Sequence, residues 1–144
     1  MPTVFITGAN RGLGLEFAKI YAENNWKVIA CCRAPLEATD LSQLASKFDK
    51  KIIIFKMDIC EQADINKFCD EYQNETIDLL INNAGAQFEN YGSAAYENMG
   101  EDPNPANYDY DMWAETMNVN LFAPTKLTGH LAPMLQRSKN AKVV

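Results

Sequence analysis

The sequence predicts an α/β fold with a doubly wound parallel sheet. Short apolar runs alternate with segments of helical periodicity, which is the pattern of βαβ units. The runs are apolar almost throughout, as expected of strands whose two faces are both covered by helices. The predicted strands are Val4–Ile6, Lys27–Cys32, Lys51–Met57 and Ile77–Ile81, and Ala141–Val144 resembles the first half of a fifth.

Helical patterns separate these strands. One opens at the end of a glycine-rich turn with Leu13, Phe17, Ile20 and Tyr21, and a short helix is predicted over Leu41–Phe48. Another helix runs from about Gln62 to Gln73, because its apolar residues recur at i, i+3, i+4 and i+7: Ile65, Phe68, Cys69 and Tyr72.

A long helix is predicted from about Tyr110 to Arg137. Its apolar stripe consists of Trp113, Met117, Leu121, Leu127, Leu131 and Leu135. Pro124 lies inside it and cannot donate to the carbonyl of Asn120, four residues back. We therefore expect a kink here, and a buried carbonyl without its usual partner.

Composition limits the function classes. The chain has 144 residues, which suits one domain, and no apolar run approaches the ~20 residues of a membrane helix. No signal peptide is expected at the N-terminus. The net charge of −6 argues against a nucleic-acid partner, whose phosphates favour a basic face.

The cysteines predict free thiols. Cys31 and Cys32 are adjacent, Cys60 and Cys69 are nine residues apart, and no CxxC or paired histidine accompanies them. The single histidine, His130, is expected at the surface or in packing, not as a metal ligand. Reduced thiols indicate a cytoplasmic protein.

The segment Thr7–Gly14, TGANRGLG, joins the first strand to the first helix. Glycines there let the backbone approach a pyrophosphate, and the helix N-terminus offers free N–H groups to an anion. The spacing is Gly-x-x-x-Gly-x-Gly, and the alternative is an ordinary tight turn without a ligand. Its place between strand and helix favours a dinucleotide.

The connection 86–109 is acidic, lacks Lys and Arg, and carries several tyrosines. A connection of this length without periodicity is usually functional. Its tyrosines either line a substrate pocket or anchor the loop, and the sequence does not decide between these roles.

Four stretches together resemble the signatures of the short-chain dehydrogenases/reductases: TGANRGLG, Asp58–Ile59, NNAG (Asn82–Gly85) and NVNLFAP (Asn118–Pro124). The resemblance spans essentially the whole chain, and VIACCRAP and LAPMLQRS are similar to the carbonyl-reductase or C-factor-like branch. It implies a single Rossmann-type NAD(P)-binding domain over residues 1–144, with strand order 3-2-1-4-5 and truncated in or after the fifth strand.

The resemblance also implies roles for residues. Asp58 would accept from the adenine amino group, although it could instead cap the following helix. Thr7, Asn82 and Asn83 would brace neighbouring strands. Asn120 is the catalytic candidate, because in the family its main-chain carbonyl holds a water of the proton relay. The expected cofactor-binding residues are Thr7, Gly8, Asn10, Arg11, Gly12, Leu13, Gly14, Arg33, Asp58, Ile59, Asn83, Ala84 and Gly85.

Charge predicts the cofactor. Proteins that prefer NAD usually end the second strand with an acid that holds the ribose hydroxyls. Here neutral Cys32 occupies that position, Arg33 follows, and Arg11 lies in the glycine turn. Two charge-assisted contacts of about 1.5–3 kcal/mol each would favour NADPH strongly over NADH. The alternative is that both arginines are solvated surface residues.

The catalytic Ser and Tyr-x-x-x-Lys of the family are missing, since no tyrosine has a lysine four positions later. We expect the cofactor-binding portion of an NADPH-dependent oxidoreductase acting on a carbonyl or alcohol, inactive alone. The alternatives are a short NADPH-binding protein without turnover and a non-catalytic interaction module. A homo-oligomer would form through the helix from Tyr110.

Overall fold

The computed structural model describes residues 1–48, 50–86 and 110–144. The acidic, tyrosine-rich stretch 87–109 therefore lies outside the described residues. The main elements are β1 (Thr3–Thr7), α1 (Gly12–Glu23), β2 (Lys27–Cys32), the 3-10 helix η1 (Pro35–Glu37), α2 (Thr39–Lys47), β3 (Ile52–Lys56), α3 (Gln62–Glu71), β4 (Leu79–Ile81), α5 (Tyr110–Met117), the π-helical segment η4 (Asn118–Phe122), α6 (Ala123–Leu135) and β5 (Lys142–Val143).

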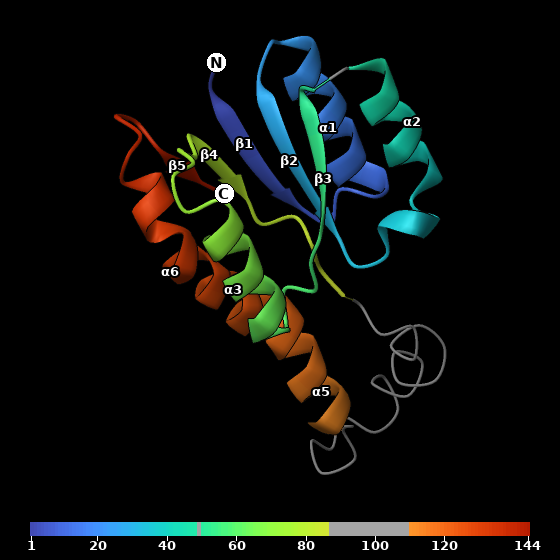
Figure 1. Cartoon of the computed structure of the whole chain (residues 1–144). Coiled ribbons are helices and arrows are strands. Elements are labelled where there is room, and N and C mark those ends of the chain that lie inside the picture. The colour runs from blue at the N-terminus through green and yellow to red at the C-terminus, as the bar shows by residue number, and fades with distance from the viewer. Residues whose placement is uncertain (49, 87–109) are drawn as a thin grey trace.

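The strands form one parallel sheet in the order β3-β2-β1-β4-β5, which confirms the predicted fold class and strand order. Helices α1 and α2 cover one face, and α3 and α6 cover the other (Figure 1). This is the doubly wound arrangement, in which parallel strands end at one common edge.

Each face of the sheet has its own hydrophobic core. Successive residues of β1 point into opposite cores. Val4 and Ile6 pack toward α1 and α2, whereas Phe5 packs toward α3 and α6. Phe68 of α3 lies at the centre of the second core, with its ring centroid 4.9 Å from that of Phe5. Burial on both faces explains why the strands are apolar in sequence without alternation.

Strand β4 begins two residues later than predicted. Ile77 donates its backbone N–H to the carbonyl of Met134 in α6. The side chain of Asp78 accepts hydrogen bonds from the backbone N–H of Thr3 and the hydroxyl of Ser138, at 2.8 and 2.7 Å. These two residues therefore tie β4 to its neighbours before the ladder of the strand starts.

The long helix after residue 109 is interrupted where Pro124 predicts it. Pro124 offers no N–H to Asn120, and the helix widens over Asn118–Phe122, where Ala123 donates to the carbonyl of Asn118, five residues back. The expected kink is thus a π-helical segment. Asn120 as a residue is exposed, while the expected burial of its main-chain carbonyl stays a prediction.

The apolar stripe of this helix divides in two. Leu127, Leu131 and Leu135 are buried against the sheet, whereas Trp113, Met117 and Leu121 are 40, 44 and 47% exposed. The difference follows from position, because α5 extends beyond the carboxyl end of the sheet (Figure 1). Among the described residues, no helix is long and apolar enough to cross a membrane.

Candidate functional site

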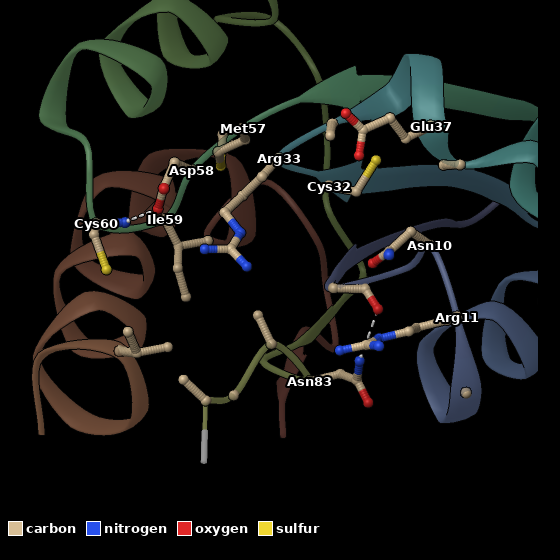
Figure 2. A pocket seen from close by; sticks show the side chains of 18 of the residues that line it. Asn10, Arg11, Cys32, Arg33, Glu37, Met57, Asp58, Ile59, Cys60 and Asn83 are labelled. Carbon is tan, nitrogen blue, oxygen red and sulfur yellow. Dashed lines mark hydrogen bonds between the residues drawn. The ribbon is translucent and has the colours of Figure 1, made fainter. Parts of the chain in front are cut away.

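A pocket of about 870 Å³ opens at the carboxyl edge of the sheet, a size typical of small-molecule sites. It lies where β1, β2, β3 and β4 end, the usual position of ligands in doubly wound folds (Figure 2). Its lining comprises Gly8, Asn10, Arg11, Gly12, Leu13, Cys32, Arg33, Ala34, Glu37, Ala38, Met57, Asp58, Ile59, Cys60, Asn83, Ala84, Gly85, Ala86 and Val119.

The glycine turn presents bare backbone to this pocket. Gly12 has a φ of +56°, and a Cβ placed on it would meet no atom within 4 Å. No side chain in the described part of the chain caps the start of α1, so its first N–H groups are available to an anion. An open, positively polarised backbone surface of this kind fits the pyrophosphate of a dinucleotide.

Gly14 has a packing role and does not line the pocket. A Cβ on it would lie 2.3 Å from the carbonyl oxygen of Gly8 and 2.6 Å from Nδ2 of Asn83. A Cβ on Gly8, whose φ is +64°, would lie 2.9 Å from Cα of Ala84. The glycine turn and the NNAG turn therefore approach each other too closely for any side chain at these positions.

Hydrogen bonds lock the same two turns together. The buried hydroxyl oxygen of Thr7 accepts from the N–H groups of Asn83 and Ala84, at 3.0 and 2.9 Å. In return, the amide of Asn83 donates to the carbonyls of Thr7 and Gly8, at 3.0 and 3.1 Å. Thr7 and Asn83 thus form the expected brace, and of the two only Asn83 also lines the pocket.

Asn82 braces neighbouring strands through its main chain and not through its side chain, which satisfies no backbone group of the described residues. Its amide nitrogen lies 3.5 Å from the hydroxyl of Thr128. Its Oδ1 is buried and has no hydrogen-bond partner among the described residues. Asn82 instead connects to β5 through its main chain, by donating to the carbonyl of Val144 at 2.8 Å.

The end of β2 is neutral and flanked by arginines. Burial raises the pKa of the Cys32 thiol, which is 5% exposed, so it is uncharged at neutral pH. Arg11 and Arg33 are exposed side chains of the pocket lining and form no ion pair with any described residue. In Figure 2, Arg33 extends toward Ile59 and Cys60.

Asp58 closes a small turn at the end of β3. Its Oδ1 accepts from the N–H of Cys60 at 3.0 Å, and its own N–H donates to Asp64 at 2.8 Å. Glu61, not Asp58, occupies the N-cap position of α3, so the alternative role of Asp58 as that cap is wrong. Burial is the main cause that raises the pKa of the Cys60 thiol, and the negative charge of Asp58 raises it further. The positive charge of Arg33 lowers this pKa and so opposes part of the increase.

Asn120 lies just outside the pocket lining and holds the chain after the NNAG turn. Its Oδ1 accepts from the N–H of Ala86 and its Nδ2 donates to the Ala86 carbonyl, both at 2.9 Å. A Cβ on Gly85 would lie 3.3 Å from Oδ1 of Asn120. Both polar atoms of the Asn120 side chain therefore form a hydrogen bond to Ala86, while the catalytic role expected of its main-chain carbonyl stays a prediction.

The pocket contains most of the residues predicted from sequence, and adds others. Of the predicted set, only Thr7, Gly14 and Asn120 do not line it. Four residues that the sequence analysis missed directly follow a strand end or a predicted site residue, and this adjacency was the available signal: Ala34, Met57, Cys60 and Ala86. Three others have no such neighbour before them in the sequence: Glu37, Ala38 and Val119.

The structure provides no grouped metal ligands within residues 1–48, 50–86 and 110–144. His130 is exposed, with its Nε2 3.1 Å from the amide nitrogen of Gln62. All four cysteines are free thiols, as their spacing predicts.

The chain is similar in sequence and fold to known proteins. The family model for short chain dehydrogenases matches residues 2–144. A short-chain dehydrogenase of Pyricularia oryzae is 28% identical over 141 residues, covering 94% of this chain and 52% of that protein. The protochlorophyllide reductase of Pisum sativum is 36% identical over 88 residues, covering 59% of this chain and 22% of that protein.

Solved structures of similar proteins have the same fold. A carbonyl reductase from Pseudomonas aeruginosa in complex with NADP superposes with a TM-score of 0.79 at 26% identity, covering 95% of this chain and 57% of that one. A short-chain dehydrogenase/reductase from Burkholderia multivorans with bound NADP superposes with a TM-score of 0.75 at 25% identity. The match covers 93% of this chain and 54% of that one. This chain spans about half or less of the length of these relatives. With its matching sequence, sheet order and pocket, the chain belongs to the short-chain dehydrogenase family.

Proposed function

We propose that the chain binds NADPH and serves as the cofactor-binding portion of an oxidoreductase acting on a carbonyl or alcohol. The observation that carries this proposal is the pocket at the sheet edge, where an open glycine turn adjoins a neutral strand end and two arginines that form no ion pair with any described residue. The Pseudomonas and Burkholderia relatives, described with NADP, support the choice of cofactor.

In this proposal, the backbone of Gly12 and Leu13 receives the pyrophosphate at the start of α1. The second carboxylate oxygen of Asp58 accepts from the adenine amino group, since its first already accepts from Cys60. Arg11 and Arg33 bind the 2′-phosphate through charge-assisted hydrogen bonds. NADPH, when bound, supplies a hydride for transfer to the carbonyl carbon of a substrate.

Nucleotide titrations test the cofactor assignment. We expect NADPH to bind more tightly than NADH in isothermal titration calorimetry. Arg33→Ala should weaken NADPH binding about tenfold or more, the equivalent of one charge-assisted hydrogen bond, and leave NADH binding nearly unchanged. Lys67→Ala, on the exposed face of α3 outside the pocket, is the matched control. Equal affinity for the two cofactors, or an unchanged preference in Arg33→Ala, would contradict the assignment.

We further propose that these 144 residues bind the cofactor without turnover. The sequence has no Tyr-x-x-x-Lys to supply the family's proton donor. The expected result is no NADPH oxidation above background with a panel of aldehydes and ketones, at concentrations where calorimetry shows saturation. Sustained oxidation by the chain alone would overturn this. Binding without turnover also fits the second candidate function, a non-catalytic NADPH-binding or interaction module, which differs in needing no further catalytic segment.

The exposed stripe of α5 and η4 suits a homo-oligomer. Met117, Leu121 and Phe122 are 44, 47 and 55% exposed on one stretch of helix. Asp111 precedes this stretch and Lys126 follows it, both exposed. In an antiparallel pair of these helices, each Asp111 would approach the partner's Lys126, which adds charge complementarity to apolar burial.

A further inference from the structure

Glu37 is an acidic residue of the pocket wall that the sequence motifs do not include. It ends η1, the short turn after β2, and lines the pocket together with Cys32 and Arg33. Figure 2 shows its carboxylate on the same side of the pocket as the Cys32 thiol, while Arg33 extends away from both. A negative charge thus lies at the strand end whose own residue is neutral.

The turn fixes the backbone from which this carboxylate extends. The N–H of Glu37 donates to the carbonyl of Ala34 at 3.1 Å, and that of Ala38 donates to Pro35 at 3.2 Å. Ala38, which follows Glu37, is 6% exposed and packs in the core shared with α1 and α2. Glu37 is therefore anchored beside the end of β2 and does not sit on a loose loop.

The charge of Glu37 is not neutralised within the described part of the chain. The ion pairs there join Lys19 to Glu16, Lys27 to Glu75 and Lys67 to Glu71, and none involves Glu37, Arg11 or Arg33. A free carboxylate at the end of the second strand accepts hydrogen bonds from ribose hydroxyls, and it repels a phosphate at the 2′ position.

We propose that Glu37 is a specificity-determining residue that holds the adenosine ribose of NADH and opposes the 2′-phosphate of NADPH. Its charge reduces the difference between the NADPH and NADH affinities that Arg11 and Arg33 produce. The inference rests on the proposed function, because it requires a dinucleotide in this pocket. It assigns to Glu37 the role that Cys32, being neutral, does not perform.

The test is Glu37→Gln, which keeps the size of the side chain and removes its charge. We expect NADPH to bind about three- to tenfold more tightly, since a screened like charge a few ångströms from the phosphate is lost. NADH should bind about two- to fivefold more weakly, since a carboxylate is a stronger acceptor than an amide. Both dissociation constants are measured by calorimetry on the full chain.

The control is Glu23→Gln, which removes the same charge from the exposed C-terminal end of α1, outside the pocket. It should change both affinities equally or not at all. A structural role of Glu37 would move both cofactors in the same direction, so parallel changes, or no change, would overturn the inference while leaving NADPH binding intact. If the unmodified chain binds neither cofactor, the proposed function fails as well.

Discussion

The two sides of the pocket are built in different ways. On the glycine-turn side, two backbone segments interlock: Gly8 and Gly14 leave no room for a Cβ, and Thr7 and Asn83 exchange hydrogen bonds. Beyond the NNAG turn, the exposed side chain of Asn120 holds the main chain of Ala86 by two hydrogen bonds. The glycine-turn side is fixed by close backbone contacts and several hydrogen bonds, so its geometry tolerates little change. The contact between Asn120 and Ala86 is made by one exposed amide, so it is more easily altered.

Gly14→Ala should have the largest effect, because its added methyl group would lie 2.3 Å from the backbone oxygen of Gly8 and 2.6 Å from Nδ2 of Asn83. We expect a loss of at least about 3 kcal/mol in the free energy of unfolding, or no folded protein. Urea denaturation measures it. Gly129→Ala is the matched control: it is a helical glycine in α6 whose Cβ would meet nothing within 4 Å. That variant should gain up to about 1 kcal/mol.

Thr7→Val should cause the second-largest loss in the free energy of unfolding. It preserves the shape of the side chain but removes the acceptor for two backbone N–H groups. The N–H of Asn83 keeps the carbonyl of Ile81 as an acceptor at 3.0 Å, whereas that of Ala84 has no other acceptor among the described residues. Leaving this one N–H unsatisfied should cost about 1–3 kcal/mol in the free energy of unfolding. Thr125→Val, on the exposed side of α6, should change stability by less than about 0.5 kcal/mol. Similar losses in the two variants would show that the brace between the turns is not what stabilises this side.

Asn120→Ala should have a local effect. Loss of its two hydrogen bonds to Ala86 should lower global stability by only about 1 kcal/mol, because the side chain is exposed. Amide hydrogen exchange of Ala86 should accelerate about tenfold, while that of Ala84, held by Thr7, stays slow. Equal acceleration at both amides would contradict the independence of the two sides.

Leu121→Ser should have the smallest effect on the folded monomer. Its side chain is 47% exposed, so the free energy of unfolding at low protein concentration should change by less than about 1 kcal/mol. If the stripe forms a homo-oligomer, sedimentation equilibrium should nevertheless show at least a tenfold weaker association. Lys139→Ser, exposed near the end of the chain, is the control. Unchanged association would remove the stripe from the interface.

The sequence predicted the strands and the glycine turn well, because both depend on local pattern. The strand segments Val4–Ile6 and Lys27–Cys32 are apolar because helices cover both faces of the sheet. This burial is visible in the sequence as continuous apolar runs. The placement of Gly8 and Gly12 at positive φ likewise follows from residue type.

Other features depend on three-dimensional placement. The helical periodicity places Leu121 and Leu131 on the same apolar stripe, although Leu121 is exposed and Leu131 is buried. The difference arises because only the part of the helix that contains Leu131 lies over the sheet. Glu37 and Val119 reach the pocket through a turn and a π-helical segment whose directions are not encoded in any short motif. Pro124 predicted a break but not its π-helical form.

In the proposed function, the backbone of the glycine turn and the arginines beside it hold NADPH. A two-dimensional ¹H–¹⁵N NMR titration of the chain with each cofactor would detect this binding residue by residue. We predict saturable shifts of the amide signals of Gly8, Gly12 and Leu13 with both cofactors, and of Arg33 only with NADPH. Absence of saturable shifts in the glycine turn, or identical changes at Arg33 with NADH, would show that NADPH is not held in this way.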